Sequence, residues 1–145
     1  MQAIPRYAKL LGYSGVLPFA VLAVLHFYGK QQIADAALRS FIAYGAIILS
    51  FLGGIRWGVA SQSDRFGGAA PVISVLPSLW AFGCLLWPDP EIALWGLMAG
   101  FMLMAIADRW FPPPGGANWM IVLRTRLSSA VIACHGIIIS SLILG

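Results

Sequence analysis

Five long stretches of this chain are almost free of charged residues, and this feature most limits what the chain can fold into. The stretches are residues 10–28, 41–59, 70–87, 92–107 and 127–144. A helix rises about 1.5 Å per residue and the hydrocarbon core of a bilayer is about 30 Å thick, so a spanning helix needs about 20 apolar residues. Hydrophobic residues make up 60% of the chain and charged residues only 10%. The sequence therefore predicts an all-α, polytopic membrane protein, a bundle of five transmembrane helices.

The connecting segments are too short to hold a soluble domain. The longest, residues 108–126, contains three consecutive prolines and then two glycines, a run that neither a helix nor a strand accommodates. We therefore expect residues 1–145 to form a single transmembrane domain. The net charge of +4 comes from positive residues at the ends of the apolar stretches rather than on one basic face, so no nucleic-acid partner is expected.

The positive residues are distributed unevenly between the two sides of the membrane. If the five spans alternate in direction, one side carries seven positive residues and the other only Lys30 and Arg39. The seven are Arg6, Lys9, Arg56, Arg65, Arg109, Arg124 and Arg126. Because short cytoplasmic loops are enriched in Lys and Arg, the N-terminus is predicted to be cytoplasmic and the C-terminus to lie on the opposite side.

Two of the predicted spans carry small residues at a spacing of four. The second span contains Ser50, Gly54 and Gly58 in line with Ala46, and the fourth contains Gly96 and Gly100. Membrane helices associate through close backbone approach at such positions, because lipid chains compete with apolar side chains for other surfaces. We expect both helices to be central in the bundle, with a homodimer interface as the alternative for either set.

Arg56 is the most informative polar residue, because it lies at the end of an otherwise apolar helix. An arginine at membrane depth costs roughly 3 kcal/mol unless it is paired or reaches the interface. On the same side, Asp108 is the natural partner and Asp64 a competing one. A candidate anion or lipid-headgroup site follows, formed by Arg56, Asp108, Arg109, Arg124 and Arg126. The alternative is a structural ion pair with ordinary interfacial arginines.

His135 is predicted to lie near the middle of the fifth span. It is a candidate for an intramembrane polar contact, either as a proton-binding group or as a contact for a quinone. A hydrogen bond to a neighbouring helix is the alternative. The other histidine, His26, differs from it in depth by two or more helical turns, so bis-histidine haem ligation is not expected. No catalytic, metal-binding or cofactor motif is present, so no cofactor is predicted, and bound phospholipid is compatible with the sequence.

Three prolines fall inside predicted spans. Pro18 lies in the middle of the first span, and Pro71 and Pro77 lie in the third. A proline removes one helical hydrogen bond and bends the helix, which is tolerated where a neighbouring helix covers the freed carbonyl. Bends at these positions either shape the bundle or act as hinges.

Several segments resemble a known family. They are residues 5–19, the motif Ser-Phe-Leu-Gly-Gly-x-x-Trp-Gly at residues 50–58, residues 77–79 and parts of residues 119–127. The chain is similar here to the bacterial family of domain of unknown function 3429, whose mitochondrial relatives include transmembrane protein 69. This resemblance implies a small helical protein of the bacterial inner membrane, and implies no particular activity, substrate or cofactor. In such a membrane the charge distribution described above places the C-terminus on the periplasmic side.

The sequence leaves two functional hypotheses open. The first is a non-catalytic accessory subunit, assembly factor or scaffold of a larger membrane complex, which fits a chain that is nearly all membrane. The alternative is a small homo-oligomeric transporter or carrier for a lipid, a quinone or an anion. An enzyme is not expected, because Asp64 and Asp108 are the only carboxylates on the basic side. The expected partners are membrane lipids and other inner-membrane proteins, or further copies of the chain.

Overall fold

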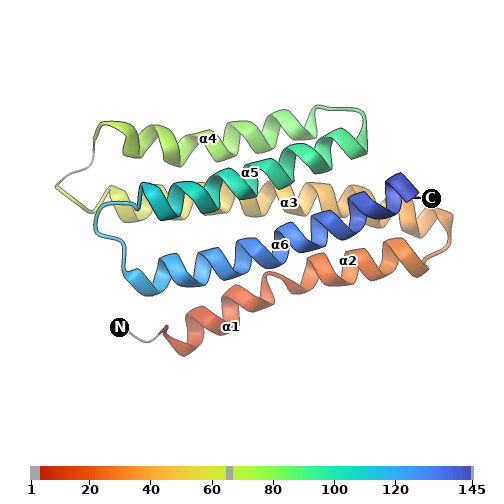
Figure 1. The fold of residues 1–145 in the computed structure, drawn as a ribbon, viewed down its shortest axis with the longest axis horizontal. Helices are drawn as coiled ribbons and strands as arrows, with labels where there is room; N and C mark the ends of the chain where they lie inside the picture. The colour runs from red at the N-terminus through yellow and green to blue at the C-terminus, as the bar shows by residue number, and fades with distance from the viewer. Residues whose placement is uncertain (1–3, 65–66, 145) are drawn as a thin grey trace.

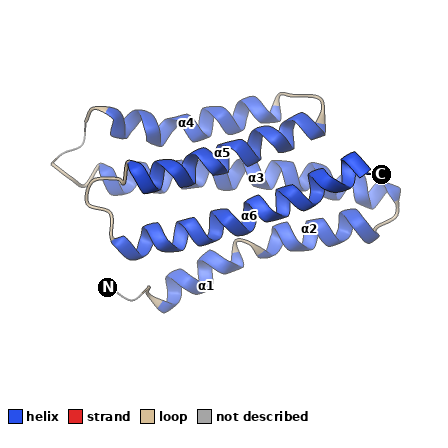
Figure 2. Cartoon of the chain, viewed as in Figure 1, coloured by secondary structure: helices blue, strands red, loops and turns tan. Residues whose placement is uncertain are grey.

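The computed structural model describes residues 4–64 and 67–144, which form helices and no strand (Figure 2). The described residues contain six helices: α1 (Arg6–Ser14), α2 (Leu17–Tyr28), α3 (Gln31–Ala60), α4 (Ala69–Leu85), α5 (Pro90–Trp110) and α6 (Asn118–Leu144). They lie side by side along one direction, with α1 and α2 following each other end to end (Figure 1). The predicted all-α bundle of five segments is confirmed, and its first segment is broken into two helices. Four of the five segments are long and apolar enough to cross a membrane.

The break between α1 and α2 has a local cause. Pro18 has no N–H to donate to the carbonyl of Ser14, so the helix is interrupted at Gly15 and Val16. The hydroxyl of Tyr44 on α3 donates to the carbonyl of Gly15 at 2.9 Å. A neighbouring helix therefore satisfies a carbonyl at the break, as membrane burial requires.

Helix α3 is the centre of the bundle and packs against α2, α4 and α5. The core where these helices meet is aromatic: the ring of Phe19 on α2 lies 5.1 Å from that of Phe41 on α3 and 6.4 Å from that of Phe101 on α5. All three side chains are fully buried. Helix α6 completes the bundle through its contacts with α5, α2 and α1.

Helix α4 lies at the edge of the bundle, on the side away from α1, α2 and α6 (Figure 1). Its 17 residues correspond to about 25 Å, near the short limit for a spanning helix. The four other segments, with α1 and α2 taken together, are longer and apolar enough to cross a membrane. The indole Nε1 of Trp80 on α4 donates to the carbonyl of Gly96 on α5 at 2.8 Å, which joins the edge helix to its neighbour.

The helices extend beyond the predicted apolar stretches. Helix α3 begins at Gln31 rather than residue 41, and α6 begins at Asn118 rather than residue 127. Hydropathy marks only the part of a helix that suits the hydrocarbon core. Polar residues with adequate helix propensity continue the same helix into the interface.

The start of α1 and the end of α6 lie at opposite ends of the bundle, because the five segments run in alternating directions (Figure 1). The start of α1, the ends of α3 and α5 and the start of α6 share one end, which we call the basic end. Arg6, Lys9, Arg109 and Arg126 are exposed there, and Arg65 lies outside the described residues.

The positive-inside rule predicts that the basic end faces the cytoplasm. We therefore expect alkaline phosphatase fused after Gly145 to be active, and green fluorescent protein fused at the same place to be dark. Both reporters are compared in whole cells at matched expression. A dark phosphatase with a bright fluorescent protein would contradict this orientation.

Candidate functional site

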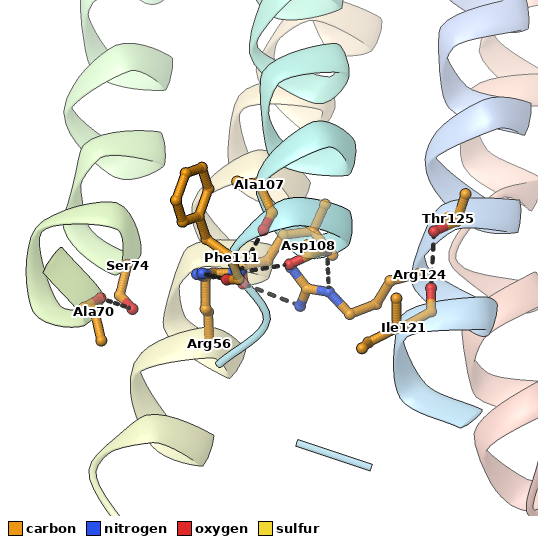
Figure 3. A network of polar contacts seen from close by, with 10 residues as sticks. Arg56, Ala70, Ser74, Ala107, Asp108, Phe111, Ile121, Arg124 and Thr125 are labelled. Carbon is orange, nitrogen blue, oxygen red and sulfur yellow. Dashed lines mark hydrogen bonds and ion pairs between the residues drawn. The ribbon is translucent and has the colours of Figure 1, made fainter. Parts of the chain in front are cut away.

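The most polar feature of the described structure is a buried cluster of Arg56, Asp108 and Arg124 near the basic end (Figure 3). Asp108 lies in the last turn of α5 and is only 2% exposed. Its Oδ1 accepts a hydrogen bond from Arg56 Nη1 at 2.9 Å, and its Oδ2 accepts one from Arg124 Nε at 2.6 Å. Arg124 Nη2 also donates to Oδ1, at 3.3 Å. One carboxylate thus joins α3, α5 and α6.

Backbone carbonyls accept three further hydrogen bonds from the two guanidinium groups. Arg124 Nη1 donates to the carbonyl of Leu52 on α3 at 3.1 Å. Arg56 Nη1 lies 3.5 Å from the carbonyl of Ala107, and its Nη2 donates to the carbonyl of Phe111. The last carbonyls of a helix have no partner within the helix, so the C-terminal end of α5 is a natural acceptor for an arginine.

The cluster contains two positive charges and one negative charge in a nearly dry environment. Arg56 is 2% exposed and Arg124 is 7% exposed. The carbonyls at the end of α5 carry partial negative charge, which offsets part of the second positive charge. Within the described residues, Arg56 Nε has no hydrogen-bond partner. With every other guanidinium nitrogen donating to the carboxylate or to a carbonyl, the cluster is arranged to fix helices rather than to transfer a proton.

The structure divides the predicted headgroup site into two groups. Arg56, Asp108 and Arg124 come together in the interior, whereas Arg109 and Arg126 are exposed at the basic end. Arg124 therefore lies in the interior, and Arg109 and Arg126 do not join it there. Asp64, the competing partner considered for Arg56, is exposed in the loop between α3 and α4.

A helical pattern in the sequence signals the burial of Arg124. Positions 124, 128, 131, 135 and 138 alternate spacings of four and three, which places them on one face of α6. All five side chains are buried. A charged residue in line with such a face points into the protein. A count of positive charges in the loops does not distinguish such an arginine from an exposed one.

His135 lies inside the aromatic core and is completely buried. Its ring centroid is 4.9 Å from that of Phe41, 5.6 Å from that of Phe101 and 5.8 Å from that of Phe19. Its Nδ1 lies 2.9 Å from the carbonyl of Val131 in its own helix, one turn away. A carbonyl only accepts, so Nδ1 carries the hydrogen and Nε2 is an acceptor without a partner among the described residues. The hydrogen bond is thus within α6 rather than to a neighbouring helix.

The predicted packing residues behave differently on the two helices. A Cβ added to Gly96 would lie 2.7 Å from Cys84 Sγ, and one added to Gly100 would lie 2.6 Å from Leu49 Cδ2, so both α5 glycines are in close contact. On α3, a Cβ at Gly54 or Gly58 would meet nothing within 4 Å. These two residues do not make the predicted helix contact within the chain.

The geometry of a helix explains this difference. Four residues turn by about 400°, so a set spaced by four drifts about 40° per step around the helix. Ala46 is buried, whereas Gly54, two steps later, is exposed. The close contact is made one position earlier, where a Cβ on Gly53 would lie 2.5 Å from the carbonyl oxygen of Ser74 on α4. Ser50 takes part through its hydroxyl, 2.9 Å from that of Ser78.

Comparisons with known proteins connect this fold to a family. Residues 4–140 match the family described as Protein of unknown function (DUF3429). Transmembrane protein 69 of Xenopus tropicalis is 37% identical over 149 residues, which cover 97% of this chain and 57% of that protein. Transmembrane protein 69 of Mus musculus is 30% identical over 127 residues, which cover 83% of this chain and 50% of that protein.

The chain spans about half the length of these curated relatives. No solved structure matches it. The family match runs from before α1 to near the end of α6, so it includes all three residues of the buried cluster. The chain is therefore a multi-pass membrane protein that belongs to the family described as Protein of unknown function (DUF3429).

Proposed function

We propose that this chain is a non-catalytic accessory subunit or assembly factor of a larger complex in the bacterial inner membrane. The observation that carries the proposal is the division of the arginines at the basic end. Arg56 and Arg124 point inward and hold three helices together, while Arg109 and Arg126 are exposed and form no hydrogen bond or ion pair with the described residues. A rigid frame with outward cations suits the binding of an acidic surface.

The intramembrane polar groups favour this proposal over a transporter or carrier. A polar pathway needs side chains that present hydrogen-bonding groups to a passing solute. Here Ser74 donates to the carbonyl of Ala70, Ser140 donates to that of Gly136, and Ser50 pairs with Ser78. His135 is enclosed by aromatic rings. These groups are used in local contacts between and within helices.

Each exposed cation near an anionic surface contributes on the order of 1 kcal/mol to the free energy of binding, and salt screens this attraction. We therefore expect the double variant Arg109→Gln/Arg126→Gln to retain several-fold less of any stoichiometric protein partner than the unmodified chain. The measurement is copurification from native membranes in a mild detergent, across a series of ionic strengths. Loss of the partner should occur at lower salt in the variant.

The matched control is Lys30→Gln/Arg39→Gln, which removes two exposed cations from the opposite end of the bundle. It should leave partner retention unchanged. A C-terminal topology reporter checks that neither variant has reversed its orientation. Equal retention by both double variants, or the absence of a stoichiometric partner of the unmodified chain, would contradict the proposed function.

A further inference from the structure

Between α4 and α5 the surface is hollowed into a long apolar groove with a volume of about 1020 Å³. This volume is at the upper end of the range typical of small-molecule sites. Residues that form its walls include Leu76, Trp80 and Trp87 on the α4 side and Ile92, Gly96 and Leu103 on α5. Among the described residues, no charged side chain lines the groove, and the indole N–H of Trp80 already donates to the carbonyl of Gly96.

The two ends of the groove differ in charge. At the basic end its lining includes Ala107 and Phe111, whose carbonyls accept from Arg56. Figure 3 shows the Phe111 ring in the space between α4 and α5, close to the Arg56 guanidinium. At the opposite end the groove reaches Trp87 and Ile92, beside the turn that carries Asp89 and Glu91.

This polarity selects the orientation of an amphiphilic ligand. The buried cluster has an excess positive charge, and Arg109 is exposed in the same turn of α5. An anionic group is attracted to this end and is repelled by the two carboxylates at the other. From Gly96 on α5 to Phe111, the residue that follows α5, the groove lining covers 15 residue steps. At about 1.5 Å per step this is about 22 Å, which is more than the depth of one leaflet of a hydrocarbon core about 30 Å thick.

We propose that this groove is a binding site for one acyl chain of an anionic phospholipid, with its phosphate at the basic end. The site goes beyond the proposed function and does not depend on a protein partner. A partner helix is the competing occupant. A partner helix would fill an apolar groove, but nothing about a helix in general places an anion at the basic end of the groove. A phospholipid of the adjacent leaflet necessarily has its phosphate at that end.

The test compares two neighbouring residues of α4 that are both about half exposed. Leu76 lines the groove and Val75 does not. Leu76→Trp fills the groove, and Val75→Trp adds the same side chain outside it. Each purified protein is placed in nanodiscs of equal parts phosphatidylglycerol and phosphatidylcholine, and the lipid that remains bound after transfer to mild detergent is counted by native mass spectrometry.

We expect the unmodified protein and Val75→Trp to retain phosphatidylglycerol several-fold more than phosphatidylcholine, and Leu76→Trp to lose most of this retained lipid. Thermal unfolding in detergent confirms that both variants are folded. Equal retention of the two lipids by the unmodified protein would overturn the proposal. So would unchanged retention in Leu76→Trp, or a protein partner that is lost from Leu76→Trp while lipid retention is unchanged.

Discussion

Replacing Asp108 by asparagine should destabilise the protein by about 3–5 kcal/mol, the size expected when a buried ion pair loses one partner. The reason is specific to this cluster. Asp108 is the carboxylate that both Arg56 and Arg124 contact, so its loss leaves two buried guanidinium groups without a counter-charge. The measurement is the free energy of unfolding in mixed micelles, obtained from denaturation with increasing fractions of sodium dodecyl sulfate.

The arginine variants should be affected less than Asp108→Asn. Arg56→Met leaves Asp108 paired with Arg124, and Arg124→Met leaves it paired with Arg56, so each single variant keeps a neutral pair. Replacing Arg56, Asp108 and Arg124 together by Met, Leu and Met should recover much of the loss, because no charge then remains buried. A network of this kind is not additive, and comparison of single and combined variants measures the coupling.

Arg39→Met is the control for this series, because Arg39 is exposed at the other end of the bundle. Its effect should lie within about 0.5 kcal/mol of zero, as for most surface substitutions. If Asp108→Asn were no more destabilising than Arg39→Met, the cluster would not hold the helices together. If Arg56→Met were as damaging as Asp108→Asn, Arg124 would not compensate for its loss.

The sequence predicts the crossing segments well because hydropathy reflects the one constraint that a bilayer imposes everywhere along the chain. It also predicts the meeting of Arg56 and Asp108, since two residues at the same membrane depth and of opposite charge have few alternatives. The count of positive charges along the loops does not reveal that the third member, Arg124, is buried. Its side chain points inward because of its position around the axis of α6, which a count of charges ignores. The interruption before Pro18 has a local cause in the sequence, but the contact that satisfies the Gly15 carbonyl comes from Tyr44 on another helix and depends on the fold.

The contacts between helices show most clearly how far a spacing pattern in the sequence can predict which residues pack together. A spacing of four is close to a full turn, and over one or two turns it describes a single face correctly. Over three turns the drift carries its last members to another face, as it does for Gly54 and Gly58. The groove between α4 and α5 is beyond any such pattern, because it depends on how far apart two neighbouring helices lie.

Gly53→Ala should destabilise the protein by about 1–3 kcal/mol, the usual effect of forcing an extra methyl group into a packed interface. The added Cβ would lie 2.5 Å from the carbonyl oxygen of Ser74 and 3.3 Å from Pro77 Cβ, so the backbones of α3 and α4 must separate. A backbone oxygen cannot rotate away as a flexible side chain does. The free energy of unfolding in mixed micelles measures the effect.

Gly54→Ala is the matched control for this prediction, since it makes the same chemical change at the next position of the same helix. A Cβ at Gly54 meets nothing within 4 Å, and alanine has the higher helix propensity, so this variant should be neutral or slightly stabilising. The opposite ranking, with Gly54→Ala destabilising and Gly53→Ala neutral, would place the α3–α4 contact on the face that the spacing of four predicts. It would also mean that Gly54 is covered in the membrane by a second copy or another protein, because lipid accommodates a methyl group without loss.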